Sequence, residues 1–384
     1  MPRVSFYTLG CKLNFAETST LARGFEQHAF EVVDFGRPAD VTVINTCSVT
    51  SEADRQCRQV IRRAQKANPD AFIVVTGCYA QLRPVQIAEI QGVDAVLGAQ
   101  EKFRLFQLIG SFDKQEQTQI SVSCIDEVTE YGPAFSSGER TRAFLKVQDG
   151  CDYSCSFCTI PLARGKSRSQ RIEQTVDQAR QIAALGYKEI VLSGVNIGLY
   201  GQEHDESLLD LLHALDEVEG VQRYRISSIE PNLLTDDIIS FVASSRRFQP
   251  HFHVPLQSGD DHVLGKMRRR YRRDLYVDRV ATIKEKMPHA CIGVDVIVGF
   301  PAETKERFEN TYRFLTDLPI SYLHVFTYSE RPDTVAVDKR DDMGGAPIPR
   351  QERSRRNRML RILSEKKRHA FYAAHQGEVR PVLW

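Results

Sequence analysis

Cys151, Cys155 and Cys158 form a Cys-x3-Cys-x2-Cys run that directly follows a strand-like segment. Three closely spaced thiolates can hold three irons of a cubane iron–sulfur cluster and leave the fourth iron without a protein ligand. Electron-transfer ferredoxin clusters use four cysteines, and structural zinc sites also close with four ligands, so the missing fourth ligand argues against both. The spacing therefore predicts an iron–sulfur cluster with an open coordination position. Three unrelated core cysteines would not be expected at this spacing.

Three further cysteines each follow a separate apolar, strand-like run. They stand in Leu9-Gly10-Cys11, Asn45-Thr46-Cys47 and Thr76-Gly77-Cys78. In an open α/β sheet the carboxyl ends of the strands meet at one edge, so these cysteines are expected to converge. A single such cysteine is more often a buried small hydrophobe, but three in the same topological position favour a second set of three thiolate ligands. The remaining cysteines are interpreted as packing residues: Cys57, Cys124 and Cys291.

The first part of the chain alternates between strand-like and helical patterns. Such alternation implies a parallel sheet with helices on its faces. Strands are predicted at 4–8, 41–45, 72–76 and 94–97, and helices at 16–28, 51–67, 84–90. The sheet would place the three strand-end cysteines at its carboxyl edge.

A second series of elements follows a polar stretch at 127–140, which is rich in Gly, Pro and Ser and predicts a linker. Six βα repeats then predict a partial barrel, in which chemistry occurs at the carboxyl ends of the strands. Cys151 directly follows the first of these strands. The strands are predicted at 143–148, 189–193, 223–227, 251–255, 292–298 and 322–328, and the helices at 172–185, 208–215, 236–243, 274–287 and 305–315.

Polar and small residues close the later strands of this second series. Each fragment alone is more often a turn or a helix cap than a ligand contact, but all of them share one face of the predicted barrel. Gly299 permits close backbone approach. His251 and His253 lie on one side of their strand, where strand-end hydrogen bonding is favoured over a metal role. The ligand-binding candidates at these strand ends are Gly194, Asn196, Ser228, Glu230, Gln257, Asp295 and Gly299.

The net charge of +1 conceals two basic blocks, at 266–273 and 350–368. Basic surfaces on a nearly neutral protein suggest a polyanionic partner, although a single basic run is more often a solvated helix face. The second block also contains Met359, Leu360, Ile362 and Leu363, so it can pack as a helix with its cations facing outward. RNA is a plausible partner. The candidate contacts are Lys266, Arg268, Arg269 and Arg270, with Arg164 and Arg168 after the cysteine run able to pair with a carboxylate or an RNA backbone.

Composition agrees with an enzyme of more than one domain. The chain has 384 residues, 42% hydrophobic and 26% charged, which is ordinary globular composition. No apolar run is long enough to span a bilayer, and the first residues lack the layout of a signal peptide. We therefore expect a cytoplasmic protein. In a reducing compartment its nine cysteines are expected to be ligands, catalytic thiols or buried hydrophobes rather than disulfides.

These motifs together resemble one known family. The stretches Thr8–Asn14, Asn45–Thr50 and Thr76–Gln81, combined with the Cys151 run and its aromatic neighbours Tyr153 and Phe157, are similar to the radical S-adenosylmethionine (SAM) methylthiotransferases. The resemblance covers nearly the whole chain. Within the family, the sequences around Cys11 and Cys47 are most similar to those of the members that act on N6-threonylcarbamoyladenosine (t6A) in tRNA. Relatives acting on isopentenyladenosine in tRNA, or on an aspartate of a ribosomal protein, usually differ at these positions.

The resemblance implies an enzyme with two [4Fe–4S] clusters. The cluster on Cys151, Cys155 and Cys158 binds SAM and splits it into methionine and a 5′-deoxyadenosyl radical, which removes hydrogen from C2 of an adenine. The cofactor thus supplies the difficult step. An auxiliary cluster on Cys11, Cys47 and Cys78 holds the sulfur to be inserted, and a second SAM supplies the methyl group. No catalytic residue is assigned beyond the cluster ligands. The SAM contacts are predicted to be Tyr153, Phe157, Gly194, Asn196, Ser228, Glu230, Gln257, Asp295 and Gly299.

The implied partners are a tRNA with t6A beside its anticodon and an electron donor such as flavodoxin or ferredoxin. A single-stranded anticodon loop is a form in which bases can be splayed and read. The two basic blocks would hold its phosphates, with affinity falling as salt rises. No membrane partner is expected, and the oligomeric state is left open.

The family ordinarily ends in a small β-barrel RNA-binding domain called TRAM, which we expect to be absent because the chain stops where it would begin. The predicted domains are an N-terminal methylthiotransferase domain at 1–126 with the auxiliary cluster, the linker at 127–140, a radical SAM core at 141–330, a basic helical extension at 331–376, and the start of a truncated TRAM domain at 377–384.

Two functions of other classes are consistent with the thiolates alone. An RNA-binding redox or iron sensor would use the clusters as switches and would need no SAM, which the strand-end residues of the second series argue against. An RNA-binding module with structural zinc would use the same thiolates without iron. Iron content and SAM cleavage distinguish these functions from a methylthiotransferase.

Overall fold

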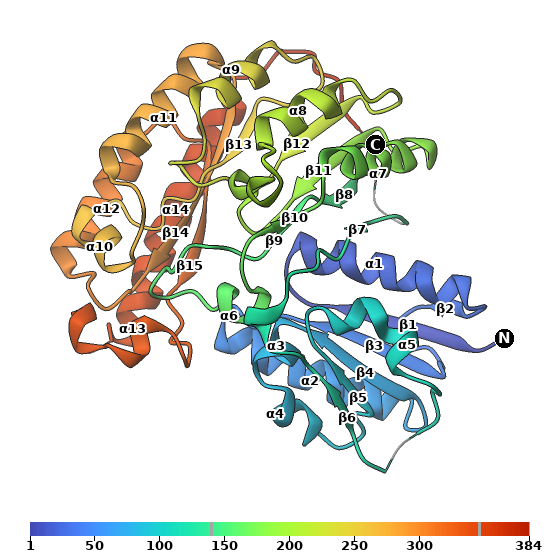
Figure 1. The fold of residues 1–384 in the computed structure, drawn as a ribbon. Coiled ribbons are helices and arrows are strands. Elements are labelled where there is room, and N and C mark those ends of the chain that lie inside the picture. Colours follow the sequence, from blue (N-terminus) through green and yellow to red (C-terminus); the bar gives the residue numbers. More distant parts are fainter. Residues whose placement is uncertain (115, 139–140, 345–346, 384) are drawn as a thin grey trace. The chain divides into compact units, whose positions relative to one another are not determined.

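The structure is a computed structural model that describes residues 1–114, 116–138, 141–344 and 347–383 (Figure 1). The chain divides into two compact units. The first unit comprises Met1–Tyr153, Thr159–Gln178 and Ser193–Val195, and the second comprises Ser154–Cys158, Ala179–Leu192 and the chain from Asn196 onward. These units are defined by compactness, and the domain boundaries given above stay predictions.

The first unit contains a six-stranded sheet in the order β2-β1-β3-β4-β5-β6. Every neighbouring pair in it is parallel, as the alternation of elements predicts. All residues of β3 and β4 are buried, which is typical of central strands covered on both faces. The strands are β1 (Arg3–Thr8), β2 (Glu31–Val33), β3 (Val41–Thr46), β4 (Phe72–Gly77), β5 (Ala95–Leu97) and β6 (Gln119–Ser121).

Alternate residues of the central strands supply two separate cores, one on each face of the sheet. Ile44 and Val75 pack in one cluster with residues of α2 (Ser51–Ala67), whereas Val43 and Val74 pack in the other with residues of α1 (Lys12–Gln27). The side chain of Thr50 caps α2 by accepting from the Ala53 amide at 3.1 Å. The other helices here are α3 (Cys78–Leu82), α4 (Pro84–Ala88), η1 (Glu101–Arg104) and α5 (Leu105–Leu108).

Shorter elements complete the first unit. β7 (Ala134–Phe135) pairs antiparallel with β8 (Ala143–Lys146), and β9 (Gln148–Asp149) pairs antiparallel with β10 (Arg168–Ser169). Ala134 and Phe135 are buried, so the stretch predicted to be a linker contains a packed strand. Residues 139–140 of that stretch lie outside the described part of the chain. η2 (Ile125–Glu127) precedes β7, and α6 (Ile160–Arg164) leads to β10.

The second unit contains most of the predicted βα series. β12 pairs parallel with β11, and β13, β14 and β15 form a parallel sheet in that order. Isolated parallel bridges, such as Ser228 with His253, continue the series from β12 to β13. Figure 1 shows α9, α11 and α12 along the outer side of these strands. The strands are β11 (Glu189–Ser193), β12 (Arg223–Ile226), β13 (His251–His253), β14 (Cys291–Val298) and β15 (Tyr322–Thr327).

The helices of this series confirm the predicted ones to within a few residues. They are α7 (Ile172–Ala184), α8 (Leu208–Asp216), α9 (Asp236–Ser244), α11 (Arg273–Lys286) and α12 (Lys305–Asp317), with α10 (Asp261–Lys266), α13 (Val335–Asp338), η3 (Ile197–Leu199), η4 (Gln202–His204) and η5 (Asp341–Met343) between them. None of the described helices combines the length and apolar character needed to cross a lipid bilayer.

The basic block at 350–368 folds as predicted into one helix, α14 (Arg350–Ala373). Leu360 and Leu363 are buried, but Ile362 is 48% exposed, so the prediction that it packs is wrong. Arg356 also departs from the prediction, because it is buried in an ion pair with Glu303 instead of facing outward. The described chain after α14 contains no further helix or strand up to residue 383.

The three cysteines interpreted as packing residues differ in burial. Cys57 lies on the buried side of α2 and is fully buried in the hydrophobic core there, which confirms the prediction. Cys291 is half-buried at the first position of β14. Cys124 is exposed next to η2, so its prediction as a packing residue is wrong, because the chain there lies outside the sheet.

Candidate metal centres

Cys11, Cys47 and Cys78 lie at the carboxyl ends of three strands that are neighbours in one sheet, in the order β1-β3-β4. Thr46 at the end of β3 is paired with Gly77 at the end of β4, so Cys47 and Cys78 both follow the last pair directly. Cys11 is the N-cap residue of α1, three residues after the end of β1. The predicted convergence of these strand ends at one edge is thus present in the fold.

Glycines bring the strand-end loops into close contact. Gly10 has φ of +103°, and a Cβ at this position would lie 2.9 Å from the Cβ of Cys47 and 3.1 Å from its Sγ. Gly77 has φ of +95°, and a Cβ there would lie 2.4 Å from the carbonyl oxygen of Thr46. Only glycine fits both positions without strain. The Gly-Cys pairs in the sequence therefore reflect close packing between the loops that carry the cysteines.

Buried amide and hydroxyl side chains fix the same loops. Asn14 Nδ2 donates to the carbonyl oxygens of Leu9 at 2.7 Å and Thr46 at 2.9 Å. Asn45 Nδ2 donates to the Asn14 carbonyl at 3.0 Å, and Thr46 Oγ1 donates to the Thr76 carbonyl at 2.5 Å. These bonds tie the three strand ends to one another, which holds the thiols in a defined arrangement.

The chemistry of these thiols fits metal ligation. Burial raises the pKa of Cys47 to about 12, and Cys78 beside it adds to the rise. Burial also raises the pKa of Cys78, an effect that the charge and a hydrogen bond of Arg164 oppose. The raised pKa values favour the protonated thiols of Cys47 and Cys78 until a metal binds and displaces their protons. All nine cysteines of the chain are free thiols.

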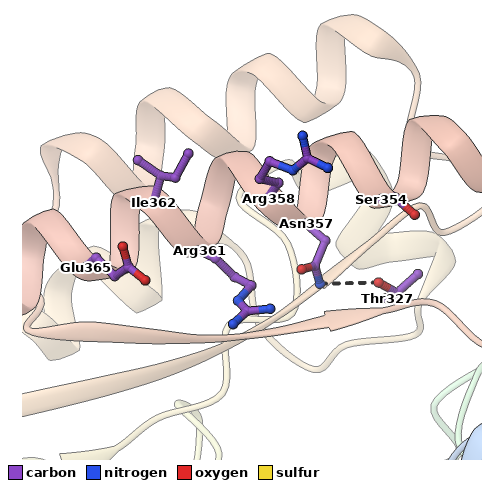
Figure 2. Close-up of a pocket in the computed structure, with 7 residues that line it drawn as sticks. All are labelled: Thr327, Ser354, Asn357, Arg358, Arg361, Ile362 and Glu365. Carbon is purple, nitrogen blue, oxygen red and sulfur yellow. Dashed lines mark hydrogen bonds between the residues drawn. The ribbon is translucent and has the colours of Figure 1, made fainter.

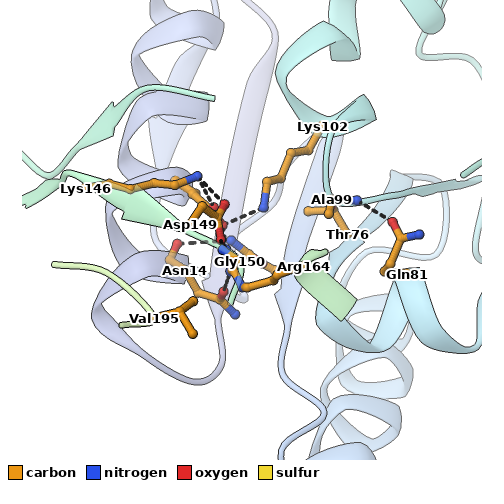
Figure 3. Close-up of polar contacts among 12 residues, drawn as sticks. Asn14, Thr76, Gln81, Ala99, Lys102, Lys146, Asp149, Gly150, Arg164 and Val195 are labelled. Atoms are coloured by element: carbon orange, nitrogen blue, oxygen red, sulfur yellow. Dashed lines mark hydrogen bonds and ion pairs between the residues drawn. The ribbon is translucent and has the colours of Figure 1, made fainter. Parts of the chain in front are cut away.

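A buried ion network lies beside these cysteines in the first unit. Glu17 accepts from Lys102 Nζ at 2.5 Å, from Lys146 Nζ at 3.0 Å and from Arg164 Nη1 at 3.1 Å. Asp149 pairs with Lys146 at 2.6 Å and with Arg164 at 2.8 Å. Figure 3 shows Lys102, Lys146, Asp149 and Arg164 pointing toward one another. Sequence reasoning missed this network.

Two predicted RNA contacts are corrected by their burial. Arg164 is only 2% exposed, and its guanidinium is occupied by Glu17, Asp149 and Asn14. Arg168 is 7% exposed on β10 and donates to the Lys166 carbonyl at 2.8 Å. Neither side chain is available to an RNA backbone.

The Cys-x3-Cys-x2-Cys run forms a loop after β9. Cys151 belongs to the first unit, where its amide donates to the Gly165 carbonyl at 3.0 Å. Gly150 before it has φ of +70°, and a Cβ there would lie 1.8 Å from the Lys166 carbonyl oxygen, so the turn requires glycine. Cys155 and Cys158 belong to the second unit, where the Cys158 amide donates to the Cys155 carbonyl at 3.1 Å.

Arg269 is the direct partner of Cys155 in the second unit. Its Nη1 donates to Cys155 Sγ at 3.0 Å, its Nη2 is paired with Glu230, and its Nε donates to the Tyr271 hydroxyl at 3.1 Å. Burial raises the pKa of Glu230, and Arg269 opposes this rise.

Arg269 is 8% exposed, so its prediction as an RNA contact is wrong, whereas Arg268 and Arg270 on either side of it are exposed. Lys266 is half-buried and donates to the Asp342 carbonyl at 2.6 Å.

Several predicted SAM contacts come together at the strand ends of the second unit. Ser228 Oγ lies 2.9 Å from His253 Nδ1, and His253 Nε2 lies 2.7 Å from Asp295 Oδ1. Gln257, with φ of +66°, donates its amide to the Asp295 carbonyl at 2.8 Å. His251 Nε2 lies 3.0 Å from the Tyr322 hydroxyl. The strand-end hydrogen bonding predicted for both histidines is confirmed, although ligand atoms of His253, Asp295 and His324 also lie within 4.8 Å of one another.

Other predicted SAM contacts pack against neighbouring residues or are buried away from these strand-end hydrogen bonds. A Cβ on Gly299 would lie 2.4 Å from Arg353 Cγ, so the close approach that this glycine permits is to α14. Phe157 packs edge-on against Phe300, with ring centroids 6.5 Å apart. Tyr153 and Gly194 belong to the first unit, and Asn196 is buried in the second.

Comparison with known proteins agrees with this arrangement. Residues 3–98 match a family model described as uncharacterized protein family UPF0004, and residues 145–315 match the radical SAM superfamily. The threonylcarbamoyladenosine tRNA methylthiotransferase MtaB of Bacillus subtilis is 42% identical over 100% of this chain and 85% of its own length. That of Aquifex aeolicus is 40% identical over 98% of this chain and 91% of its own length.

The chain belongs to the radical SAM methylthiotransferase family. It is therefore a transferase whose cofactors are SAM and [4Fe–4S] clusters. A more distant relative, the tRNA-2-methylthio-N(6)-dimethylallyladenosine synthase of Bacillus licheniformis, is 32% identical over 98% of this chain and 74% of its own length. The solved structure of the radical SAM methyltransferase TsrM from Kitasatospora setae shares the fold, with a TM-score of 0.63, 16% identity, and coverage of 88% of this chain and 77% of that one.

Proposed function

We propose that this methylthiotransferase converts t6A beside the anticodon of tRNA to its 2-methylthio derivative. The observation that carries the proposal is the presence of two separate sets of three cysteines, one at three adjacent strand ends and one in the loop after β9. The names of relatives that are 40–42% identical support the choice of substrate. A tRNA substrate supports a cytoplasmic location for the proposed activity.

The two sets of cysteines have different roles in this proposal. Cys151, Cys155 and Cys158 hold the cluster that binds SAM, and Cys11, Cys47 and Cys78 hold the auxiliary cluster. When bound, the first cluster supplies the electron that cleaves SAM to a radical able to attack an unreactive C–H bond. The chain would hold each cluster by three thiolates, one fewer than the four that bind an electron-transfer ferredoxin cluster. Arg269 fixes the Cys155 side chain through its 3.0 Å hydrogen bond.

The strand ends of the second unit are proposed to bind SAM. The carboxylates of Glu230 and Asp295 and the hydroxyl of Ser228 suit the ribose hydroxyls and the amino group of this cofactor. His253 orients both Ser228 and Asp295, because each of its ring nitrogens is hydrogen-bonded to one of them. Glu230 is paired with Arg269, and its side chain is only 12% exposed. Carbonyls at Gly194 and Asn196, and the side chains of Tyr153, Phe157 and Gln257, stay predicted SAM contacts.

Exposed cations of the second unit are proposed to hold the tRNA phosphates. Arg268 and Arg270 are exposed after α10. Arg358 and Arg361 line an open hollow of about 390 Å³ between α14 and Thr327 of β15. Figure 2 shows both side chains on the same stretch of α14, with Asn357 donating to the Thr327 hydroxyl beside them. Their guanidinium groups suit phosphate oxygens. A one-electron carrier such as flavodoxin or ferredoxin is the proposed electron donor.

A second substrate is supported by the more distant relatives. The proteins that are 31–32% identical to the chain are named as synthases of 2-methylthio-N(6)-dimethylallyladenosine in tRNA. An isopentenyl-type adenosine in tRNA is therefore the alternative substrate. It has an apolar N6 substituent, whereas t6A has a carboxylate, so a direct comparison of the two tRNAs distinguishes them.

The test is mass spectrometry of tRNA nucleosides after reaction. The anaerobically reconstituted protein is incubated with SAM, a reductant and matched tRNAs that carry either t6A or dimethylallyladenosine. We expect the methylthio derivative of t6A, with no product from the Cys151→Ala variant. Product from the dimethylallyladenosine tRNA alone would overturn the proposed substrate, and iron loading without SAM cleavage would favour a redox sensor.

A further inference from the structure

The buried ion network of the first unit, formed by Glu17, Lys102, Lys146, Asp149 and Arg164, has unbalanced charge. Three cations surround two carboxylates, which leaves one net positive charge. The side chains of all five are at most 9% exposed. Arg168, which is also buried and acts on Asp149, adds charge of the same sign.

Electrostatic interactions within the network favour the charged forms of its two carboxylates and of Arg164. Burial by itself raises the pKa of Glu17, but Arg164, Lys102 and Lys146 together hold it well below its usual range. The pKa of Asp149 is likewise low because Arg164 and Lys146 outweigh its burial. Burial lowers the pKa of Lys102, but its 2.5 Å contact with the ionised Glu17 opposes this effect. Three cationic side chains packed directly against two carboxylates therefore give the network an excess of positive charge.

Arg164 links this charge to the strand-end cysteines. Its positive charge acts on Cys78, Cys11 and Cys47. Its Nη2 donates to Asn14 Oδ1 at 2.6 Å, and Asn14 in turn donates to the backbone of Leu9 and of Thr46. Arg164 therefore lies within electrostatic reach of the cysteines and, through Asn14, fixes the chain before Cys11 and Cys47.

A buried net charge is costly unless a charge of opposite sign lies nearby. The site on Cys11, Cys47 and Cys78 provides that charge when it is loaded. Three thiolates around an oxidised [4Fe–4S] core of charge 2+ leave one negative charge, and reduction by one electron adds another. The reduced state therefore gains more than the oxidised state from a nearby positive charge.

We propose that the network of Glu17, Lys102, Lys146, Asp149 and Arg164 is the counter-charge of the auxiliary cluster, and that Arg164 is the positioning residue through which it sets the reduction potential of that cluster. This inference rests on the proposed function, which assigns Cys11, Cys47 and Cys78 as ligands. It does not depend on which nucleoside is the substrate.

The test measures the reduction potential of the auxiliary cluster alone. A chain with Cys151, Cys155 and Cys158 replaced by Ala is reconstituted anaerobically, and the potential is followed by electron paramagnetic resonance in a mediated titration. Arg164→Gln removes a positive charge and is expected to shift the potential to more negative values, as is Lys102→Met. Glu17→Gln removes a negative charge and is expected to shift it to more positive values. Arg164→Lys is the matched control and is expected to stay near the parent.

The opposite signs separate electrostatics from simple loosening of the fold. If the network had only a structural role, Arg164→Gln and Glu17→Gln would shift the reduction potential in the same direction, or not at all, at equal iron content. This result would overturn the proposal. If Arg164→Gln does not fold, Lys102→Met and Glu17→Gln decide the question by the same comparison. Absence of iron from the parent chain would instead overturn the ligand assignment, and with it the proposal.

Discussion

Single residues hold the proposed metal-binding loops in place. Two of them are glycines that can be recognised in the sequence because each directly precedes a cysteine. Gly10 and Gly77 each precede a cysteine and have positive φ. The structure adds the reason, because the backbone of Gly10 is packed against the Cys47 side chain. Arg269 is the opposite case. Its position in a basic block suggested an RNA contact, and only the fold reveals that it faces inward to Cys155 and Glu230.

Gly10→Ala is expected to empty the auxiliary site while sparing the other cluster. The added Cβ would meet Cys47 at 2.9 Å in a backbone conformation that alanine avoids. Iron content after reconstitution should fall from about eight to about four per chain. Gly36→Ala is the matched control, because Gly36 also has positive φ but has nothing within 4 Å of the added Cβ. Equal iron loss in both variants would contradict the role of the Cys47 contact.

Arg269→Ala is expected to lower the free energy of unfolding by about 3 kcal/mol, because it leaves Glu230 buried without its partner. Arg268→Ala removes the same charge from an exposed neighbour and should change stability by less than about 0.5 kcal/mol. Thermal unfolding of the two variants makes the comparison. Similar stability of both would show that Arg269 is not an essential partner of Glu230.

Secondary-structure elements position the chemistry, and most of them were predictable from sequence. Apolar runs that each end shortly before a cysteine identify β1, β3 and β4, so the convergence of their carboxyl ends followed from the parallel topology. The edge strands β2 and β6 were missed, because they are short and mostly exposed. α14 was predicted as a helix, but the charges that it buries were not, since a basic run does not reveal which cation meets a distant carboxylate such as Glu303.

The exposed face of α14 is expected to contribute to tRNA affinity. Reversing two of its charges with Arg358→Glu and Arg361→Glu should weaken binding and reduce the slope of log K against log salt by about 1 to 2, since each released phosphate contact contributes about 0.7 to 0.9. Fluorescence anisotropy over a salt series measures this slope. Arg62→Glu with Lys66→Glu on the exposed face of α2 matches the charge change. An equal loss in this control would indicate a general charge effect.

The contact between α14 and the turn before α12 is expected to depend on pH. Burial raises the pKa of Glu303 from 4.5 to about 7, although Arg356 at 2.6 Å and the Gly299 amide oppose the rise. The folded chain therefore binds more protons than the unfolded chain between these values, so stability falls as pH rises from about 4.5 to about 7. The loss from this group is at most about 3 kcal/mol. Glu303→Gln should flatten unfolding midpoints across this range, and an unchanged pH profile would contradict the assignment.

At the scale of the whole molecule, the two sets of cysteines and the order of the βα elements were predictable from the sequence. Both depend on local signals, which are the spacing of the cysteines and the periodicity of the hydrophobic residues. The sequence did not reveal the buried network of Glu17, Lys102 and Arg164, whose members come from segments far apart in the chain. Such long-range pairs leave no periodic pattern. The proposed function therefore depends on cysteines that the sequence identifies, whereas the proposed reduction potential of the auxiliary cluster depends on charged residues that only the fold brings together.

The central claim is that the chain holds two clusters on separate sets of three cysteines. The iron content of three proteins tests this claim most directly. Each protein is reconstituted anaerobically and its iron and sulfide are counted per folded chain. We expect about eight irons in the native chain, about four when Cys11, Cys47 and Cys78 are replaced by Ala, and about four when Cys151, Cys155 and Cys158 are replaced. A native chain with only about four irons, or either triple variant that retains about eight, would contradict the account.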